Sequence, residues 1–288
     1  MGLFSIFSRR ADRDAAAETT AEVVPQADLA PLLDWHAQHH RAAWRPVIGE
    51  EVGALAQFGG APLLAFGETM PTCTHCGRDL QLIVQIDLDH VPAELGGTFG
   101  SGLLQLFYCI GGDETPEHPD CYGEDGWEAF TDTASRVRVL PAAVGVVRGS
   151  ARDDFPALPI VAWERFDDAP DWDEWPSVGL SARRGGEIGF GASELTWLSA
   201  GEQTTLTVPN EQVDLFPSPA TGDKLGGWPY WVQSVEYPAC PRCNSEMRLV
   251  LQIDSDDHVP YTWGDCGCGH ITQCPQHLDV VAFGWACT

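Results

Sequence analysis

Short runs of apolar residues, bounded by glycine, proline or polar turns, dominate the hydrophobic pattern of this chain. Four of these runs, residues 81–87, 102–109, 247–254 and 280–285, are rich in leucine, isoleucine, valine and aromatic side chains. Side chains of these types favour the extended backbone of a sheet, so each run predicts a strand. Few stretches carry a helical pattern. The chain therefore predicts a β-dominated α+β fold.

One helical pattern lies near the N-terminus. Leu29, Leu32 and Leu33 recur at the spacing of one helix face, and Asp28 precedes them as a candidate N-cap. This pattern predicts a helix from about Leu29 to Trp44. Three histidines lie on it at helical spacing, His36, His39 and His40. They are placed to share a metal, but no cysteine is close in sequence, so a partly exposed helix face is favoured.

The strand at residues 81–87 belongs to a segment that occurs twice. Residues 57–87 align with residues 224–254 without a gap, and ten of the thirty-one positions are identical. Average residue usage would supply about two matches by chance. The identical positions are Gly59/Gly226, Gly60/Gly227, Pro62/Pro229, Pro71/Pro238, Cys73/Cys240, Cys76/Cys243, Leu82/Leu249, Gln85/Gln252, Ile86/Ile253 and Asp87/Asp254. We therefore expect two internally duplicated antiparallel-sheet modules, each with a Gly-Gly-x-Pro turn, a Cys-x-x-Cys zinc knuckle and a strand ending in Gln-Ile-Asp.

Composition divides the chain into four parts. Residues 1–27 are rich in alanine, threonine and acidic residues and predict a flexible leader. Residues 28–140 hold the helix and the first module, and residues 221–288 hold the second. Between them, residues 141–220 carry many prolines, tryptophans and acidic residues, so we expect an irregular connecting region. The prolines that disfavour long regular elements there are Pro156, Pro159 and Pro170.

The second module carries the strongest chemical signal in the sequence. Cys240-Pro-Arg-Cys243 is followed, thirty intervening residues later, by Cys274-Pro-Gln-His277. Zn²⁺ prefers four tetrahedral ligands and a Cys-x-x-Cys turn offers two, so the two motifs together supply three thiolates and one imidazole. The alternative is that these cysteines are reduced and simply buried. With four protein ligands no coordination position stays open, so the zinc would be structural and not catalytic.

The first module carries a second, looser set of cysteines. Cys73-Thr-His-Cys76 is followed by Cys109, after the second predicted strand, and by Cys121. These four residues are candidates for another structural zinc site, which gives one or two zinc ions per chain. The possible substitute ligands in this region are His75 and His118. The cysteines left without a role are Cys266, Cys268 and Cys287.

Charge narrows the class of partner. Lysine and arginine together number 16 against 42 aspartates and glutamates, a formal net charge of −26. A negative field of this size repels nucleic acid and anionic lipid and favours a basic protein partner, although solubility alone is the alternative reason for it. No apolar run approaches the ~20 residues of a membrane span. We expect a cytoplasmic protein whose ten cysteines are metal ligands or buried thiols and not disulfides.

Several motifs occur in a defined order along residues 45–288. They are Phe58-Gly-Gly-Ala-Pro62, Gly102–Tyr108, Ile160–Glu164 with Asp167–Pro170, Lys224–Trp231, Leu249–Ser255 and Trp263-Gly-Asp265. In order and spacing these segments resemble the YwqG-like family, a bacterial group of largely unassigned function. Many members of that family lack the cysteines, so the metal sites rest on the residues of this chain alone.

The Gly-Gly-x-Pro turn, the Cys-x-x-Cys knuckle and the glutamine-containing strand are also distantly similar to those of programmed-cell-death-2-like proteins. Those eukaryotic proteins act as dedicated chaperones for a basic ribosomal protein, and the similarity covers only the two short modules. Together with the charge, it implies a non-catalytic, zinc-stabilised protein-binding module with a basic partner. Chaperones, adaptors and immunity proteins belong to this class.

The alternative is an enzyme that uses carboxylates at the ends of the duplicated strands. The acids there are Asp87 and Asp89, then Asp254, Asp256 and Asp257. The sequence contains no G-x-S-x-G elbow, H-E-x-x-H motif, Walker A loop or G-x-G-x-x-G after a strand. Acidic turns after strands are usually only solvated, because a catalytic site needs converging groups. A cleft that joined Gln85 and Asp87 to Gln252 and Asp254 would favour the enzyme, and a filled interior would exclude it.

Overall fold

The computed structural model describes residues 23–288 apart from several short segments. Those segments are residues 52–53, 113–114, 117, 120, 122–127, 132, 142–145, 151–154, 186–190 and 200. The predicted flexible leader at residues 1–27 lies almost entirely outside the described residues, which begin at Val23. Strands make up most of the described regular structure, which confirms the β-dominated α+β fold.

Helix α1 (Gln26–Ala37) is shorter than the sequence predicts, because strand β1 (Arg41–Ile48) takes the residues assigned to its C-terminal part. The prediction of a helix through residue 44 is therefore wrong. A proline within β1 lacks the N–H that a helix requires, and β1 instead pairs along its length with a neighbouring strand. Pro25 occupies the N-cap position, so Asp28 lies in the first turn and is not the cap.

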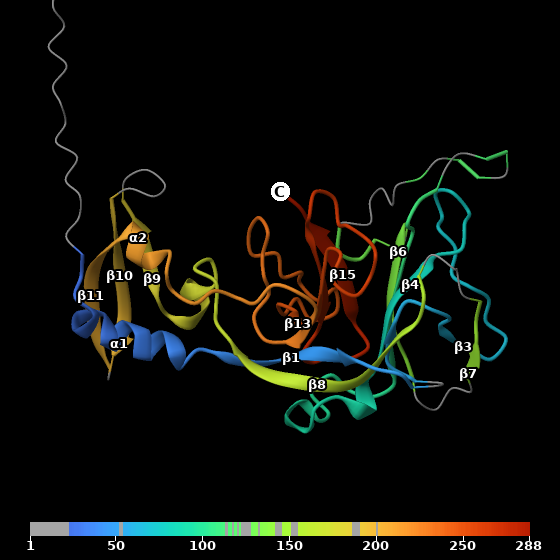
Figure 1. Cartoon of the computed structure of the whole chain (residues 1–288), viewed down its shortest axis with the longest axis horizontal. Coiled ribbons are helices and arrows are strands. Elements are labelled where there is room, and N and C mark those ends of the chain that lie inside the picture. Colours follow the sequence, from blue (N-terminus) through green and yellow to red (C-terminus); the bar gives the residue numbers. More distant parts are fainter. Residues whose placement is uncertain are drawn as a thin grey trace, which may run out of the picture.

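One antiparallel sheet forms the main body of the described structure (Figure 1). Its strand order is β15-β14-β13-β12-β1-β8-β2-β4-β5-β6. β1 and β8 (Leu158–Asp168) form the centre, and strands of the two modules flank them. Those of the first module are β2 (Gln57–Phe58), β4 (Gln81–Asp87), β5 (Leu103–Tyr108) and β6 (Ser135–Leu140). Those of the second module are β12 (Lys224–Gly226), β13 (Arg248–Asp254), β14 (Cys268–Gln273) and β15 (Val281–Ala286).

The two groups of strands repeat the same register, which confirms the internal duplication. β4 and β13 cover aligned residues, and each carries an irregularity at the aligned position, between Leu82 and Val84 in one and between Leu249 and Leu251 in the other. A short antiparallel bridge closes the knuckle of both copies, and the bridged pairs are Thr72/Asp79 and Ala239/Glu246. The glycines of both turns have positive φ, which glycine adopts at little cost: Gly59, Gly60, Gly226 and Gly227.

The sheet curls so that its two halves share one core. β6 and β15 stand at opposite ends of the strand order, yet they lie next to one another. Between the halves, the ring of Tyr108 packs edge-on against Trp263 with centroids 5.0 Å apart. Trp285 Nε1 donates a hydrogen bond of 3.0 Å to the Tyr108 hydroxyl. Buried apolar side chains of β4, β5, β13 and β14 fill the remaining space between the two half-sheets.

The region at residues 141–220 contains regular strands, so the expectation of an irregular connection is wrong. β8 runs through 11 residues. β9 (Ser181–Arg184), β10 (Ala192–Ser199) and β11 (Glu202–Pro209) form a separate sheet, which α2 (Asn210–Val213) follows. At one end of the molecule, α1 packs on this small sheet through Leu29, Leu32 and Trp35 (Figure 1). The three prolines lie at or beside the ends of β8, where a missing N–H costs little: Pro156, Pro159 and Pro170.

The remaining short elements connect these parts. β3 (Leu63–Ala65) pairs with β7 (Val146–Arg148) beside the first module. The 3-10 turns are η1 (Leu88–His90), η2 (Ala93–Leu95) and η3 (Trp175–Val178). Within the described ranges, no helix is both long enough and apolar enough to cross a membrane.

Candidate metal centres

Three cysteines and one histidine of the second module meet at one end of β13, β14 and β15. Cys240 and Cys243 lie in the knuckle before β13, and Cys274 and His277 lie in the turn from β14 to β15. Cys243 Sγ is 3.6 Å from Cys274 Sγ, and His277 Nδ1 is 3.6 Å from Cys274 Sγ and 3.8 Å from Cys240 Sγ. Tetrahedral ligands at about 2.3 Å from zinc stand about 3.5–4 Å apart. The predicted convergence of these four residues is therefore confirmed.

Backbone hydrogen bonds shape this knuckle around its sulfurs. Asn244 adopts a left-handed φ of 58°, and its N–H donates to Cys240 O at 2.8 Å, which closes the turn. The N–H of Arg242 donates to Cys240 Sγ at 3.4 Å, and the N–H of His277 donates to Cys274 Sγ at 3.3 Å. Amide donors of this kind stabilise a thiolate and orient it toward a metal.

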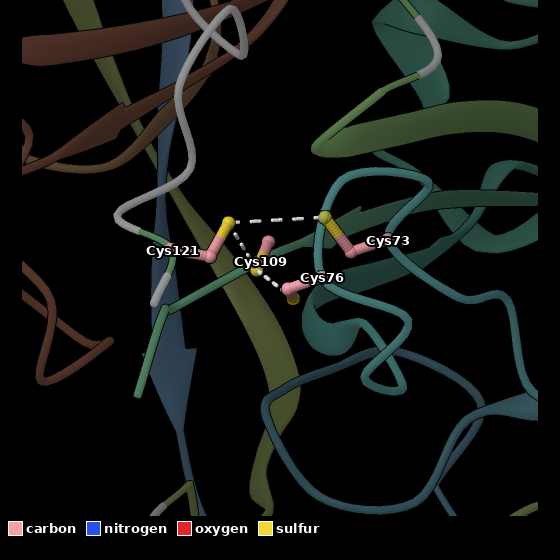
Figure 2. Close-up of side chains that lie close together, drawn as sticks. All are labelled: Cys73, Cys76, Cys109 and Cys121. Atoms are coloured by element: carbon pink, nitrogen blue, oxygen red, sulfur yellow. Dashed lines mark hydrogen bonds between the residues drawn. The ribbon is translucent and has the colours of Figure 1, made fainter. Parts of the chain in front are cut away.

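The four cysteines of the first module converge in the same way (Figure 2). Cys109 Sγ is 3.7 Å from Cys76 Sγ and 3.6 Å from Cys121 Sγ, and Cys121 Sγ is 3.9 Å from Cys73 Sγ. All four side chains are buried, and in each cluster the four ligand atoms lie within 4.8 Å of one another. The His118 Nδ1 atom lies 2.8 Å from Cys76 O and bonds the backbone of the knuckle instead. Cys121 thus completes the set, and neither substitute histidine joins it.

Three of the four positions are equivalent in the two clusters, and the fourth differs. The N–H of Cys109 bonds the residue before β6 at 2.7 Å, and the N–H of Cys274 bonds the residue before β15 at 3.0 Å. These two cysteines therefore occupy the same place after the second strand of each module. Cys121 reaches the first cluster from a longer loop, whereas His277 follows Cys274 directly in the turn.

Each cluster combines thiols with opposed pKa shifts. Burial raises the pKa of Cys109 and that of Cys274 above the ordinary range. Burial also opposes ionisation of Cys76, but hydrogen bonds from a backbone amide and from neighbouring thiols outweigh it and lower the pKa. Hydrogen bonds from Ser245 lower the pKa of Cys243 to about 6. Adjacent thiolates repel one another, so a divalent cation is what would allow each whole cluster to ionise.

The other cysteines do not join either cluster. All ten cysteines lie among the described residues and none forms a disulfide, since the sulfur separations in the clusters are far longer than the about 2.05 Å of a disulfide. Cys268 is buried, with its Sγ 3.6 Å from Ile253 O, and lines the core. Cys266 is exposed and Cys287 is half-buried. Among the described residues, these three belong to no group that would hold a metal ion.

The histidines of α1 do not form a metal site either. His40 Nε2 is 3.4 Å from His36 Nδ1, whereas His39 Nδ1 lies 2.8 Å from Trp35 O. His36 is buried against the rings of Trp175 and Phe216, and burial together with the charge of His40 lowers its pKa to about 4. In the described part of the chain these side chains do not converge on one point.

A third group, of which the sequence analysis named only Asp257, links the two modules. His258 Nδ1 is 2.9 Å from Asp223 Oδ2 and 3.5 Å from Asp257 Oδ1, and its ring stacks on Phe58 with centroids 5.0 Å apart. Burial raises the pKa of Asp223 to about 6, and the bond to Asp223 raises the pKa of His258. The N–H of Asp254 already donates to Asp223 Oδ1 at 2.7 Å. This group is therefore a hydrogen-bonded link, and its signal in the sequence was the Asp-Asp-His run after β13.

The duplicated glutamines hold the backbone of each module together. Gln85 Oε1 accepts from Leu63 N–H at 3.0 Å, and Gln252 Oε1 accepts from Tyr230 N–H, the aligned residue, at 2.8 Å. Each amide group also donates to a carbonyl just before its glycine turn. Both glutamines are completely buried. They clamp the turn to the strand and do not face a cleft.

The duplicated aspartates also bond within their own modules. Asp87 Oδ2 is 2.6 Å from His90 Nδ1, and Asp254 Oδ2 accepts from Gly222 N–H at 2.7 Å. Asp87 and His90 line a hollow of about 390 Å³ beside β8, whose described lining holds no serine, threonine, cysteine or lysine. The contacts of the described residues therefore do not join the two Gln-Ile-Asp motifs in a catalytic cleft.

Comparison with known proteins places this architecture in a family. A stretch of 39 residues is 44% identical to a protein named "Uncharacterized protein YpfL" from Salmonella typhimurium, and it covers 14% of this chain and 9% of that protein. The name YwqG-like does not come from either comparison, so that resemblance stays a prediction from the motifs. Residues 56–287, which include both modules, match the family described as "Domain of unknown function (DUF1963)". This chain therefore belongs to the DUF1963 family.

Proposed function

We propose that this protein is a non-catalytic, zinc-stabilised module that binds a basic protein in the cytoplasm. The observation that carries the proposal is the pair of four-residue clusters at equivalent ends of the two modules. One zinc ion would be held by Cys73, Cys76, Cys109 and Cys121. The other would be held by Cys240, Cys243, Cys274 and His277.

The donor sets fit structural zinc. Four thiolates, or three thiolates and one imidazole, are the ligand sets of structural zinc sites. Each cluster supplies all four ligands from the protein, so no position is left for water or substrate. Bound zinc supplies the positive charge that allows the neighbouring thiols to ionise together. The residues themselves tie the knuckle to the second strand and to the loop or turn before the third strand of each module.

The partner is proposed from charge and from the absence of a catalytic arrangement among the described residues. A net charge of −26 attracts a basic surface at long range and repels nucleic acid. The buried glutamines and the filled space between the half-sheets support binding over catalysis, because the strand-end carboxylates are engaged within their own modules. Chaperone, adaptor and immunity roles all require such a surface and no reactive group.

Affinity capture of the tagged, full-length protein from its native cell, followed by reconstitution with the purified partner, tests this function. We expect one dominant basic protein, whose binding weakens steeply as salt rises, because the attraction is between net charges. Cys274→Ser should reduce both zinc content and binding. Cys266→Ser, which changes an exposed cysteine outside both clusters, is the matched control and should leave both unchanged. Captures without a basic protein but with a retained metabolite would contradict the proposal.

A further inference from the structure

A recess of about 700 Å³ lies on the outer face of β14 and β15. These strands contribute His270, Thr272 and Gly284 to its lining, and Ile271, which lies between the first two along β14, belongs to the shared core on the opposite face. The segment after the second Gly-Gly-x-Pro turn contributes Trp231 and Glu236. A recess of this volume lies within the range of about 300–1,000 Å³ that is usual for ligand sites.

In the first module, an arginine of the chain itself fills the corresponding position. Arg138 of β6 donates from Nε to Gln105 Oε1 at 2.9 Å. Its guanidinium forms a two-pronged ion pair with Glu68, in which Nη2 lies 3.1 Å from Oε2. The same group lies 5.4 Å from the centre of the Phe107 ring. Acid, amide oxygen and aromatic ring together hold this guanidinium.

Strand register makes Arg138 and Gly284 equivalent. Gln105 pairs with Arg138 across β5 and β6, and His270 pairs with Gly284 across β14 and β15. Gln105 and His270 are in turn the strand partners of the duplicated glutamines in β4 and β13. The recess of the second module is therefore the place that an arginine side chain occupies in the first.

The polar groups of the second module are arranged for the same occupant. Gln105 Nε2 donates to Leu63 O at 2.6 Å, and its Oε1 accepts from Arg138. The ring of His270 bonds Tyr230 O, the carbonyl aligned with Leu63 O, and its Nε2 has no hydrogen-bond partner among the described residues. Burial, together with a nearby lysine, lowers the pKa of His270 to about 3, so the ring is neutral and Nε2 is an acceptor. This acceptor lacks the donor that Arg138 supplies in the first module.

The described lining of the recess supplies acids but no cation, and Arg41, outside the lining, hydrogen-bonds Tyr237 of the lining. The Arg138 guanidinium lowers the pKa of Glu68 in the first module, whereas burial raises the pKa of Glu236 in the second. No arginine or lysine is present in the lining of the recess, as far as the chain is described. Trp231 offers the aromatic ring that Phe107 offers in the first module. The site thus combines an acid, an acceptor and an aromatic ring without the cation that they would hold.

We propose that this recess binds the side chain of an arginine carried by the basic partner protein, an inference that rests on the proposed function. The guanidinium takes the place of Arg138, pairs with Glu236 at the rim and lies against Trp231. Because His270 Nε2 is covered in the free protein, its bond to the guanidinium forms with a small shift of the surrounding side chains. A lysine fits less well, because an ammonium has neither the planar face nor the forked donors of a guanidinium.

Isothermal titration of the zinc-loaded, full-length protein with the capped peptide Gly-Gly-Arg-Gly-Gly tests the recess alone. We expect saturable binding at one site, at least tenfold tighter than that of the matching lysine and citrulline peptides. Gly284→Arg, which supplies the missing side chain from within, should weaken peptide binding at least tenfold. Glu236→Gln should weaken it about fivefold, and Glu246→Gln, an identical charge change on an exposed residue of the same module, should leave it unchanged.

Circular dichroism and zinc content verify that each variant folds. If Gly284→Arg does not fold, Glu236→Gln alone tests whether the recess binds the peptide. Equal peptide binding by wild type, Gly284→Arg and Glu236→Gln would overturn the proposal that the recess is the arginine site. Free L-arginine bound as tightly as the peptide would overturn the assignment to a protein-borne arginine. If wild type and Gly284→Arg captured a basic protein equally, the recess would not be the arginine site, but the proposed protein-binding function would stand. Peptide binding without any captured basic protein would instead count against the proposed function.

Discussion

The two modules share one hydrogen-bonded framework and differ in what they add to it. Both close the knuckle with the same bridge, and both clamp the glycine turn with a buried glutamine. They differ in the fourth residue of the candidate metal cluster, in the outer face of the sheet, and at the first position of the repeat. The comparison shows that duplication kept the bonds that satisfy buried backbone groups, since their loss is expensive, and varied the side chains around them.

The first position of the repeat shows this difference most clearly. Gln57 donates to Gly59 O in its own turn, whereas the aligned Lys224 donates to Asp168 Oδ2 of β8 at 2.8 Å. The side chain of Lys224 is completely buried, and that of Asp168 is almost completely buried. Asp168 also accepts from the N–H of Trp228 at 2.8 Å. The second module is therefore fixed to the central strand by a charge pair, and the first by strand pairing and neutral hydrogen bonds.

Removal of the metal should have the largest effect on stability. A strong chelator should unfold the knuckles of both modules, because structural zinc in small domains supplies about 10 kcal/mol or more of folding free energy. Cys109→Ser and Cys274→Ser, which change equivalent ligands, should each abolish one site and leave the other occupied. Urea unfolding followed by tryptophan fluorescence measures the loss, and Cys266→Ser serves as the control. An unfolding midpoint that is indifferent to the chelator would contradict the structural role.

Lys224→Gln, which gives the second module the residue of the first, should cost about 3–5 kcal/mol of unfolding free energy. The reason is that Asp168 would remain buried and charged without its partner. The double variant Lys224→Gln/Asp168→Asn should recover most of that loss, since no buried charge is left. Urea unfolding of the three proteins at the same pH gives the result. A cost below about 1 kcal/mol in the single variant would show that the ion pair does not hold the second module.

The link between His258 and Asp223 should make the second module sensitive to pH. The hydrogen bond to Asp223 raises the folded pKa of His258 above the ordinary 6.5, so its stabilising contribution is full below 6.5 and is lost as pH rises through the folded pKa. Asp223 acts with the same sign, because burial raises its folded pKa from 3.8 to about 6. We expect His258→Gln to cost about 0.2–1 kcal/mol near pH 6 and less near pH 9. A cost that grew with pH would contradict this sign.

Exchange of the fourth ligand should have the smallest effect. Cys121→His gives the first cluster the ligand type of the second, and His277→Cys does the reverse. Both sets are usual for structural zinc, so zinc content should stay within experimental error of wild type. Elemental analysis measures it, with Cys121→Ser as the variant that does lose metal. Loss of zinc in Cys121→His alone would show that the long loop of the first module accommodates only a thiolate.

The sequence was sufficient for much of what depends on local spacing. The apolar runs predicted β4, β5, β13 and β15 but not β6, and the spacing of the cysteines and His277 predicted which residues converge. It was insufficient where long-range pairing decides the structure. Residues 41–44 continue a helical pattern in the sequence. They form strand instead, because β1 pairs along its length with β8. The recess escaped notice because loops of unequal length separate Gln105 from Arg138 and His270 from Gly284, so only strand register reveals their equivalence.

The central claim, that both modules retain a complete metal site, is tested most directly by the zinc content of the purified protein. Elemental analysis of wild type should approach two zinc ions per chain, because each cluster holds four ligand atoms within 4.8 Å of one another. Cys121→Ser should lower the value to about one and leave the cluster of Cys240, Cys243, Cys274 and His277 occupied. A wild-type value near one that Cys121→Ser does not change would contradict the account, since the first knuckle would then be only a buried turn.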